Sequence, residues 1–167
     1  MKRLILMMTA ALMAVAASAQ KFGHIDSQAL IEQLPDYKDA QKTLDQKAAA
    51  FEEQMTTLNE EFQKQLADAQ ANADKLTEEE TAQKQKELQE MYAKVQGFQR
   101  QAQETLQKEQ QTLLQPILMR VQRIVQEVGV EGGYLYIFEK QAGLTPFVSE
   151  SLSEDITPLV KKKLGIN

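Results

Sequence analysis

Few side chains of this sequence could do chemistry, and none of them forms a recognised catalytic set. The single histidine, His24, lies in a short apolar stretch, and no serine carries a nucleophile motif that could complete a Ser/His/Asp set with it. The run Glu78 to Glu80 could ligate a metal ion, but three carboxylates at the start of a helix are more often a solvated cap. We therefore expect no catalytic residue, no metal site and no enzymatic activity.

Cofactor and thiol chemistry are not indicated either. None of the seven glycines has the spacing of a phosphate-binding loop ahead of Lys and Ser or Thr. The chain has no cysteine, which excludes disulfides, thiol catalysis and lipid attachment through a cysteine. We expect a function that needs no cofactor and no ATP.

The charge balance argues against a nucleic-acid partner. The chain holds 19 basic and 24 acidic residues, a formal net charge of −5. Such a balance repels phosphate backbones and anionic lipid. The only basic cluster, Lys161-Lys162-Lys163, fits the last turn of a short helix that stops at Gly165.

The first 19 residues have the pattern of a cleaved secretory signal peptide. Lys2 and Arg3 precede an apolar run from Leu4 to Ala16 and the small-residue end Ala17-Ser18-Ala19. The apolar run is short for a membrane span and no second one follows, so we expect no integral span after cleavage; an uncleaved anchor is the alternative. Removal of residues 1–19 leaves about 17 basic and 24 acidic residues, a net charge of about −7, in a chain that begins at Gln20.

Two apolar stripes dominate the middle of the chain. From Tyr37 to Leu76, and again from Leu88 to Val128, an apolar residue recurs at steps of three and four. The mean step of about 3.5 is the period of a coiled-coil seam. Nearly every residue off the stripes is Gln, Glu, Lys or Asp, and the second stripe lacks one apolar step at Gln110. The pattern predicts two helices that pack along a narrow seam.

A reversal between the two stripes is predicted near 74–78. Thr77 and Glu80 have the spacing of a capping box, in which the hydroxyl and the carboxylate each accept a backbone N–H from the other residue. Acidic residues in the first turn also suit the positive end of the helix dipole. We therefore expect a helical-hairpin arm over 36–128, with one continuous rod, in which Thr77 is an ordinary surface residue, as the alternative.

Strand patterns lie on both sides of this arm. Residues 21–26 form one candidate strand, ahead of a short helix over 28–34 with Ser27 as its N-cap. Residues 134–138 give the strongest strand pattern, and 146–149 would pair with them as a hairpin. Thr157 and Pro158 begin a last short helix. Residues 20–35 and 129–167 thus form a β-rich body.

The expected fold class is α+β, with a long antiparallel α-helical hairpin inserted into a small β-rich oligomerisation body. The arm must return, because only then can 21–26 pair with 134–149. A body of about 60 residues is near the size at which a single core becomes marginal, and its edge strands invite pairing with another chain. We expect a homo-oligomer whose candidate contact residues are Phe22, Ile25, Leu135, Ile137 and Phe147.

Four short motifs carry a resemblance to a known family. They are Phe22-Gly23-His24-Ile25-Asp26, Leu34-Pro35-Asp36-Tyr37, Leu113-Leu114-Gln115-Pro116-Ile117 and Asp155-Ile156-Thr157. In this order, with the insertion layout and the signal peptide, they resemble the Skp/OmpH family of periplasmic chaperones over essentially the whole mature chain. The resemblance implies a homotrimer in the periplasm, with three helical arms around a cavity. It also implies a holdase that keeps unfolded outer-membrane β-barrel precursors from aggregating.

One departure from the family bears on how clients are captured. The best-known members are strongly basic, whereas this chain is acidic throughout its arms. No basic cluster on the arms matches a lipopolysaccharide site, so the resemblance implies no such site here. Either the clients of this chain are differently charged, or apolar and Gln-rich polar contacts dominate.

Large apolar residues of the arm are the candidates for client contact. Many weak contacts, summed by multivalency, would allow release without ATP. Packing between the two helices is the simpler explanation for each candidate, although Met55 and Met91 lean toward client contact because flexible thioethers suit promiscuous surfaces. The candidates are Phe51, Met55, Leu58, Phe62, Met91 and Phe98.

Gly97 and Pro116 are candidate hinges, because both residue types weaken a helix interior.

The alternative function for the whole chain is a periplasmic coiled-coil scaffold or adaptor with a fixed envelope partner. Such a protein would show the same signal peptide, arms and body. Promiscuous suppression of aggregation separates the two functions.

Overall fold

The computed structural model describes residues 20–166 except 142, 144 and 146, so the expected signal peptide over 1–19 lies outside the described residues. The elements in chain order are β1 (Lys21–Ile25), α2 (Ser27–Ile31), α3 (Pro35–Ala71), the 3-10 turn η1 (Ala73–Lys75), α4 (Glu78–Gly132), β2 (Tyr134–Glu139), β3 (Ser153–Asp155) and α5 (Thr157–Leu164). They confirm the α+β class, with a long helical hairpin between the first two strands.

The chain divides into two units, each with its own internal contacts. We call residues 35–117 the arm and the described residues of 20–34 and 118–166 the body. On α4 this division falls after Ile117, whereas the sequence pattern placed it at 128. The difference arises because the later apolar residues of α4, buried Val121 and Val128, belong to the core of the body.

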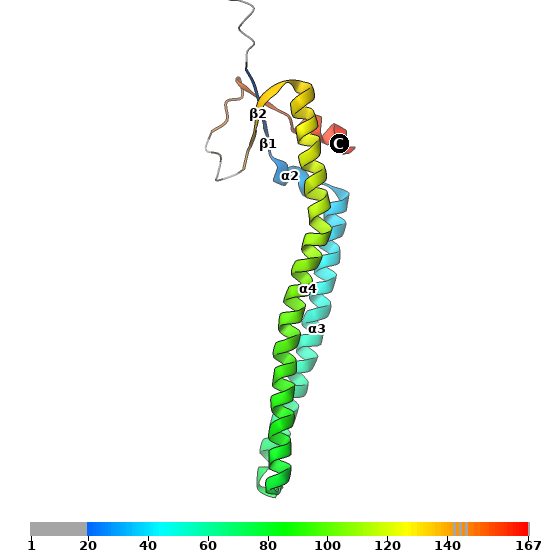
Figure 1. Cartoon of the computed structure of the whole chain (residues 1–167), viewed down its shortest axis with the longest axis vertical. Helices are drawn as coiled ribbons and strands as arrows, with labels where there is room; N and C mark the ends of the chain where they lie inside the picture. The colour runs from blue at the N-terminus through cyan, green and yellow to red at the C-terminus, as the bar shows by residue number, and fades with distance from the viewer. Residues whose placement is uncertain (1–19, 142, 144, 146, 167) are drawn as a thin grey trace, which may run out of the picture. The chain divides into compact units, whose positions relative to one another are not determined.

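In the arm, α3 and the first part of α4 run side by side as a hairpin (Figure 1). Most members of the two apolar stripes are at least half-buried, as the coiled-coil period predicts, but Ala48 and Ala73 are exposed. The single-rod alternative is therefore wrong. None of the helices in the described part of the chain is both long and apolar enough to cross a membrane.

The reversal of the arm lies where the sequence predicts it. Helix α3 ends at Ala71 and α4 begins at Glu78, with η1 between them. The backbone N–H of Thr77 donates to Glu80 Oε2 at 2.8 Å, and the Glu80 N–H donates to Thr77 Oγ1 at 3.3 Å. These are the two bonds of a capping box. The hydrogen bond from the Thr77 backbone holds the pKa of Glu80 below its usual value, so the cap is an ionised carboxylate at neutral pH.

The body contains a three-stranded sheet with the order β2-β1-β3, in which both pairings are parallel. The pairing of β1 with β2 confirms that the arm returns the chain to its starting strand. Parallel pairing is possible because a long crossover, here the whole helical insertion, separates the two strands. Strand β1 is central, so β2 and β3 each keep one edge without a strand partner in the described sheet.

The predicted hairpin of 134–138 with 146–149 is wrong. The described residues 147–149 form no strand, and residue 146 lies outside the described residues. The third strand is instead Ser153–Asp155, and it pairs with β1. Polar Ser-Glu-Asp has little strand propensity, so this strand forms because the free edge of β1 offers hydrogen-bond partners, not because of local preference.

A register shift between β1 and β2 decides which side chains share a face of the sheet. Lys21 pairs with Tyr134 but Phe22 pairs with Tyr136, so Leu135 is an extra residue, as in a β-bulge. Beyond this bulge, Ile137 lies on the same face as Gly23, where a Cβ would meet Ile137 and Ile156. That face packs on the core of the body. The buried apolar residues of the core include Ile25, Leu30, Ile31, Leu34, Val121, Val128, Ile156 and Val160.

Both short helices of the body begin one residue away from the predicted cap. Asp26, not Ser27, caps α2, because its Oδ1 accepts the N–H of Ala29 at 2.9 Å. Thr157 is the first residue of α5, and its own N–H donates to Asp155 Oδ1 at 2.9 Å. In each case an aspartate carboxylate, one or two residues before the hydroxyl residue, accepts a backbone N–H. Gly165 ends α5 in the left-handed conformation, as predicted.

The end of α4 depends on a close approach between a glycine and an aromatic ring. The helix runs through Gly129 to Gly132, and Gly133 then turns the chain with a φ of 65°. A Cβ at Gly132 would come within 2.7 Å of Tyr134 Cδ2 and closer still to Cε2. The Tyr134 ring therefore occupies the space that any larger residue at 132 would need.

We predict that Gly132→Ala destabilises the protein by about 1–3 kcal/mol, because the added methyl overpacks against Tyr134. The matched control is Gly97→Ala, also within α4, where a Cβ meets nothing within 4 Å. There the better helix propensity of alanine should stabilise by about 0.5–1 kcal/mol. Thermal melting followed by circular dichroism measures both. A melting point raised by Gly132→Ala would contradict the close packing.

Candidate functional site

The seam of the arm is built from aromatic contacts between α3 and α4. Phe51 and Phe98 meet edge to face, with ring centroids 5.9 Å apart and an interplanar angle of 72°. Further along, Phe62 and Tyr92 meet at 6.1 Å. Both separations lie in the range of favourable aromatic pairs. The seam thus uses its largest side chains to join the two helices.

All six residues predicted to contact clients lie on this seam and are half-buried. Phe51, Phe62 and Phe98 take part in the ring pairs, which supports inter-helix packing as their first role. Half-burial leaves part of each side chain at the surface. The full set is Phe51, Met55, Leu58, Phe62, Met91 and Phe98.

Tyr92 is an exposed aromatic residue of the arm that the sequence pattern missed. It is 53% exposed although its ring contacts Phe62. It follows Met91 directly and so lies off the apolar stripe, where the period gives no signal. The arm therefore presents one large aromatic side chain to solvent beside its seam.

A charged pair occupies the gap in the second apolar stripe. Lys47 Nζ on α3 lies 2.8 Å from Glu109 Oε2 on α4, and the two side chains are 42% and 29% exposed. The sequence marks this place only by the missing apolar step at Gln110, which is exposed, as is Ala48 next to Lys47. An ion pair in an apolar seam favours one register of the two helices, since a slipped register would leave each charge at the seam without its partner.

The acid side chains of the arm concentrate in the half that contains the reversal. Residues 52–90 contain more carboxylates than basic residues. The basic residues are Lys64, Lys75, Lys84 and Lys86. Two of these lysines pair with carboxylates on their own helix, Lys84 with Glu87 and Lys86 with Glu90. This half therefore carries strong net negative charge. Its acidic residues are Glu52, Glu53, Glu60, Glu61, Asp68, Asp74, Glu78, Glu79, Glu80, Glu87 and Glu90.

The two candidate hinges both lie inside an unbroken helix. Helix α4 is continuous through Gly97, which is half-buried, and through Pro116, which is exposed. Proline has no N–H, so the carbonyl of Thr112 lacks the helical donor four residues on. A hinge role for either residue stays a prediction.

The body exposes an aromatic face on the side of the sheet opposite its core. Phe22 stacks with Tyr136 at a centroid distance of 6.5 Å, and Phe138 lies 6.2 Å from Phe22 and 6.0 Å from Tyr136. Tyr136 is 60% and Phe138 is 50% exposed. We call these three residues the aromatic face. Two exposed rings beside the half-buried Phe22 ring on one sheet surface are unusual for a face that meets only water.

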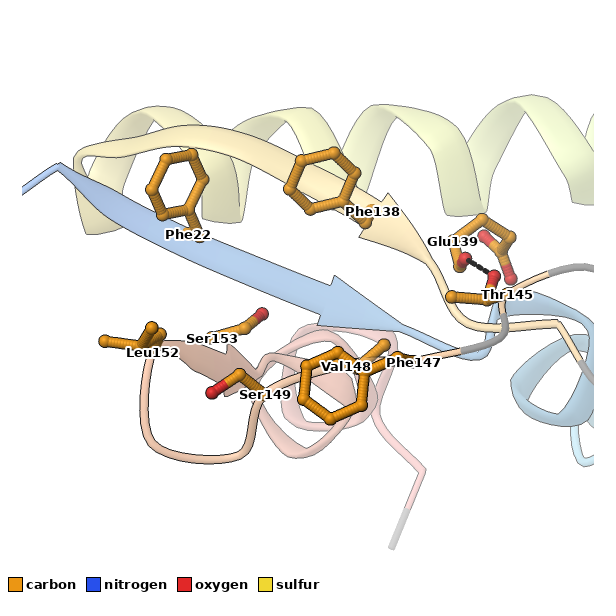
Figure 2. A pocket seen from close by; sticks show the side chains of 9 residues that line it. All are labelled: Phe22, Phe138, Glu139, Thr145, Phe147, Val148, Ser149, Leu152 and Ser153. Carbon is orange, nitrogen blue, oxygen red and sulfur yellow. Dashed lines mark hydrogen bonds between the residues drawn. The ribbon is translucent and has the colours of Figure 1, made fainter.

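A groove of about 500 Å³ borders the aromatic face. Figure 2 shows Phe22 and Phe138 on the sheet, with Phe147, Val148 and Leu152 from the connection between β2 and β3 on the other side. Phe147 is 80% and Leu152 is 75% exposed. Thr145 fixes this connection to the end of β2, since its hydroxyl donates to the carbonyl of Glu139 at 2.7 Å. The groove and the aromatic face form one apolar surface.

The five predicted oligomerisation residues fall on different sides of the body. Phe22 and Phe147 line the groove, and Leu135 is 52% exposed at the bulge. Ile25 is only 2% exposed and Ile137 packs toward Gly129, so both lie on the core side of this chain. The sequence missed Tyr136 and Phe138. Counting every second residue from Leu135 puts Ile137 on the exposed face of the strand. Because of the bulge, Tyr136 and Phe138 lie there instead.

The polar residues around the sheet act as links between strands. His24 is buried, and its Nδ1 lies 2.9 Å from Ser153 Oγ, which joins β1 to β3. Lys21 Nζ lies 2.9 Å from Glu154 Oε2 and 4.2 Å from the centre of the Tyr134 ring. The hydrogen bond with Glu154 raises the pKa of Lys21, and the same bond lowers the pKa of Glu154. Among the described residues, no group of three or more His, Asp or Glu side chains could hold a metal ion.

Comparisons with known proteins agree with this architecture. The model of the family described as outer membrane protein (OmpH-like) matches residues 21–164. Among solved structures, the chain is similar to a candidate outer membrane chaperone (OmpH-like) from Caulobacter crescentus CB15. The TM-score is 0.71 at 13% identity, covering 89% of this chain and 86% of the other. A search of curated proteins finds no significant match.

We predict that reversing the charge of Glu109 destabilises the arm and that Lys47→Glu restores it. Glu109→Lys places two ammonium groups in the seam, which should cost about 1 kcal/mol. The swapped pair should recover most of this loss, because the attraction returns. Urea unfolding of both single variants and the double variant measures the coupling, with Glu104→Lys as an exposed control on the same helix. Additive single effects would show that the two side chains do not interact.

Proposed function

We propose a function on the premise that this chain belongs to the OmpH-like family of outer membrane proteins. The chain acts as an ATP-independent periplasmic holdase chaperone that binds unfolded outer-membrane β-barrel precursors in a cavity between helical arms. Its role is to prevent aggregation, and it is not an enzyme. The observation that supports this function best is the arm, a long hairpin whose seam residues pair with each other yet stay half-exposed.

The client class follows from what the arm can bind. An unfolded β-barrel precursor exposes alternating apolar residues and unpaired strand edges, and it aggregates unless it is enclosed. The half-exposed Met55, Met91 and Phe98, with exposed Tyr92, offer scattered apolar contacts without a deep pocket. Each contact is weak, and many together give useful affinity through multivalency. Release then needs no nucleotide.

The acidic half of the arm adds an electrostatic preference. In the described part of the chain the carboxylates of 52–61 form no ion pair with a lysine, whereas Lys84 and Lys86 pair with Glu87 and Glu90. Free surface carboxylates attract cationic segments of an unfolded chain at ranges up to the Debye length. Capture by this chain therefore favours basic stretches of its clients and uses apolar contacts for the rest.

The body provides the oligomer that places several arms around one client. The aromatic face and the groove form an apolar surface whose exposed residues, such as Phe138 and Phe147, would be covered by a second copy. The free edges of β2 and β3 add backbone hydrogen-bonding groups at the same sheet. We assign a homotrimer, the state that the family resemblance implies.

Residues 1–19 direct the chain to the periplasm. The charged start, the apolar run and Ala17-Ser18-Ala19 fit a secretory signal peptide that is cleaved after Ala19. The mature protein then works in the periplasm, where ATP is not required of it. Outer-membrane precursors cross this space unfolded.

The function is tested by diluting a urea-unfolded outer-membrane β-barrel protein into buffer and following light scattering. The mature chain, residues 20–167, should suppress aggregation when present at one trimer per client. Different barrel proteins should be protected to a similar degree. Failure at this ratio would overturn the holdase proposal and would favour a scaffold with one fixed envelope partner.

A charge variant tests the electrostatic part of client capture. Glu60→Gln with Glu61→Gln removes two exposed carboxylates of the arm, and the control, Glu32→Gln with Glu150→Gln, removes two exposed ones of the body. The arm variant should need about two- to threefold more protein for half-suppression at low salt, since exposed charge contacts are worth about 0.2–1 kcal/mol each. Equal activity of both variants would show that arm charge does not assist capture.

The aromatic face predicts a change of oligomeric state in a single variant. Phe138→Glu places a charge among the stacked rings and should convert the trimer to monomer in light-scattering mass measurements. The control Val130→Glu changes an 83% exposed residue outside the face and the groove, and should stay trimeric. A wild-type chain that is monomeric, or a Phe138→Glu variant that remains trimeric, would contradict the assignment.

A further inference from the structure

Gln20 becomes the N-terminal residue once residues 1–19 are removed, and a glutamine at an N-terminus is chemically reactive. Strand β1 begins at Lys21, so Gln20 lies just outside the sheet ladder. Its side chain is exposed. No hydrogen bond or ion pair among the described residues holds its amide. The side chain of Gln20 is therefore free to turn toward its own backbone nitrogen.

We propose that Gln20 is a modification site, where the mature N-terminus closes to a pyroglutamyl lactam. This inference rests on the proposed export and on cleavage after Ala19. The unprotonated α-amino nitrogen of Gln20 attacks its own side-chain amide carbon, Cδ, and forms a five-membered ring. The tetrahedral adduct then collapses, the bond from Cδ to the amide nitrogen breaks, and ammonia leaves with the proton given up by the α-amino group.

The reaction is complete within one residue. An α-amino group has an ordinary pKa of about 7.7–8.0, so a useful fraction is unprotonated and nucleophilic at neutral pH. The amide carbon and the nitrogen belong to the same side chain and backbone, which gives the attack the advantage of an intramolecular reaction. No oxidant, metal or second substrate is needed. The loss of ammonia makes the closed form the stable end of the reaction.

The surroundings of Gln20 give the lactam a structural consequence. Gln20, Lys21, Glu150 and Glu154 line the same shallow pocket on the body. In this pocket Lys21 is already bound to Glu154, and the pair joins β1 to β3. A free α-ammonium at Gln20 would be a second cation beside Lys21 and would compete for the same carboxylate. The lactam is neutral, so it leaves the Lys21 to Glu154 pair undisturbed.

The lactam also changes how the end of the chain meets other proteins. A blocked N-terminus gives aminopeptidases no free amine to bind. Trimming past Gln20 would next remove Lys21, and with it the contacts to Glu154 and to the Tyr134 ring. Closure at Gln20 therefore protects the first residue of the central strand. Such protection suits a protein that must persist among proteases outside the cytoplasm.

The test labels the free amines of the exported protein. The full chain with its own leader is expressed in a bacterium and recovered from the periplasm. Amines are reductively methylated, and a protease that cuts before Asp26 releases the N-terminal peptide 20–25. We expect a peptide about 17 Da lighter through loss of ammonia, with a label only on the Lys21 side chain.

Two controls make the result specific. The Gln20→Ser variant cannot close, so its peptide should carry labels on both the α-amine and Lys21. A synthetic peptide of residues 20–25, carried through the same work-up, should stay mostly open, which excludes closure during handling. Equal closure in the synthetic peptide would overturn a modification made in the cell.

The remaining outcomes separate this inference from the proposed function. A peptide that starts at Gln20 with labels on both amines overturns the lactam and leaves export standing. A peptide that starts at another residue overturns the cleavage after Ala19 and the lactam together. A closed, singly labelled peptide supports both.

Discussion

The parallel pairing of β1 with β2 is the constraint on which the rest of the fold depends. Lys21 pairs with Tyr134, and the whole arm lies between these two residues in the sequence. The insertion must therefore leave and return, which only an antiparallel hairpin of α3 and α4 achieves with so few connecting residues. The bulge at Leu135 within this pairing then sorts the aromatic side chains. It turns Ile137 to the core and leaves Tyr136 and Phe138 beside Phe22 on the open face.

The small amount of apolar surface on the arm limits what the arm can bind. Its apolar stripe is narrow, and the pairs Phe51 with Phe98 and Phe62 with Tyr92 use much of it to hold the hairpin together. Little continuous apolar surface is left for a client. Tight, specific binding needs a buried cluster of anchors, which the described arm lacks. We therefore propose recognition through weak contacts that are spread along the helices and assisted by carboxylates.

Sequence patterns predicted the elements whose own residues favour them, and they failed where contacts with distant parts of the chain decide the structure. The two stripes, the capping box of Thr77 and Glu80, and the strands at 21–25 and 134–139 all follow from local sequence. Strand Ser153–Asp155 does not, because its polar residues pair only where β1 offers an edge. The parity of Tyr136 and Phe138 was hidden by one inserted residue. The ion pair of Lys47 with Glu109 appeared in the sequence only as a gap in the stripe.

Hydrogen exchange of the arm, with and without an unfolded outer-membrane barrel, tests most directly whether client binding is distributed. The narrow seam predicts modest extra protection spread over both helices, from about Phe51 on α3 to Phe98 on α4, with little change in β1. The protection should fade when the client folds or leaves. Strong protection confined to one short segment of the arm, or confined to the body, would contradict distributed binding and would indicate a dedicated site for a single partner.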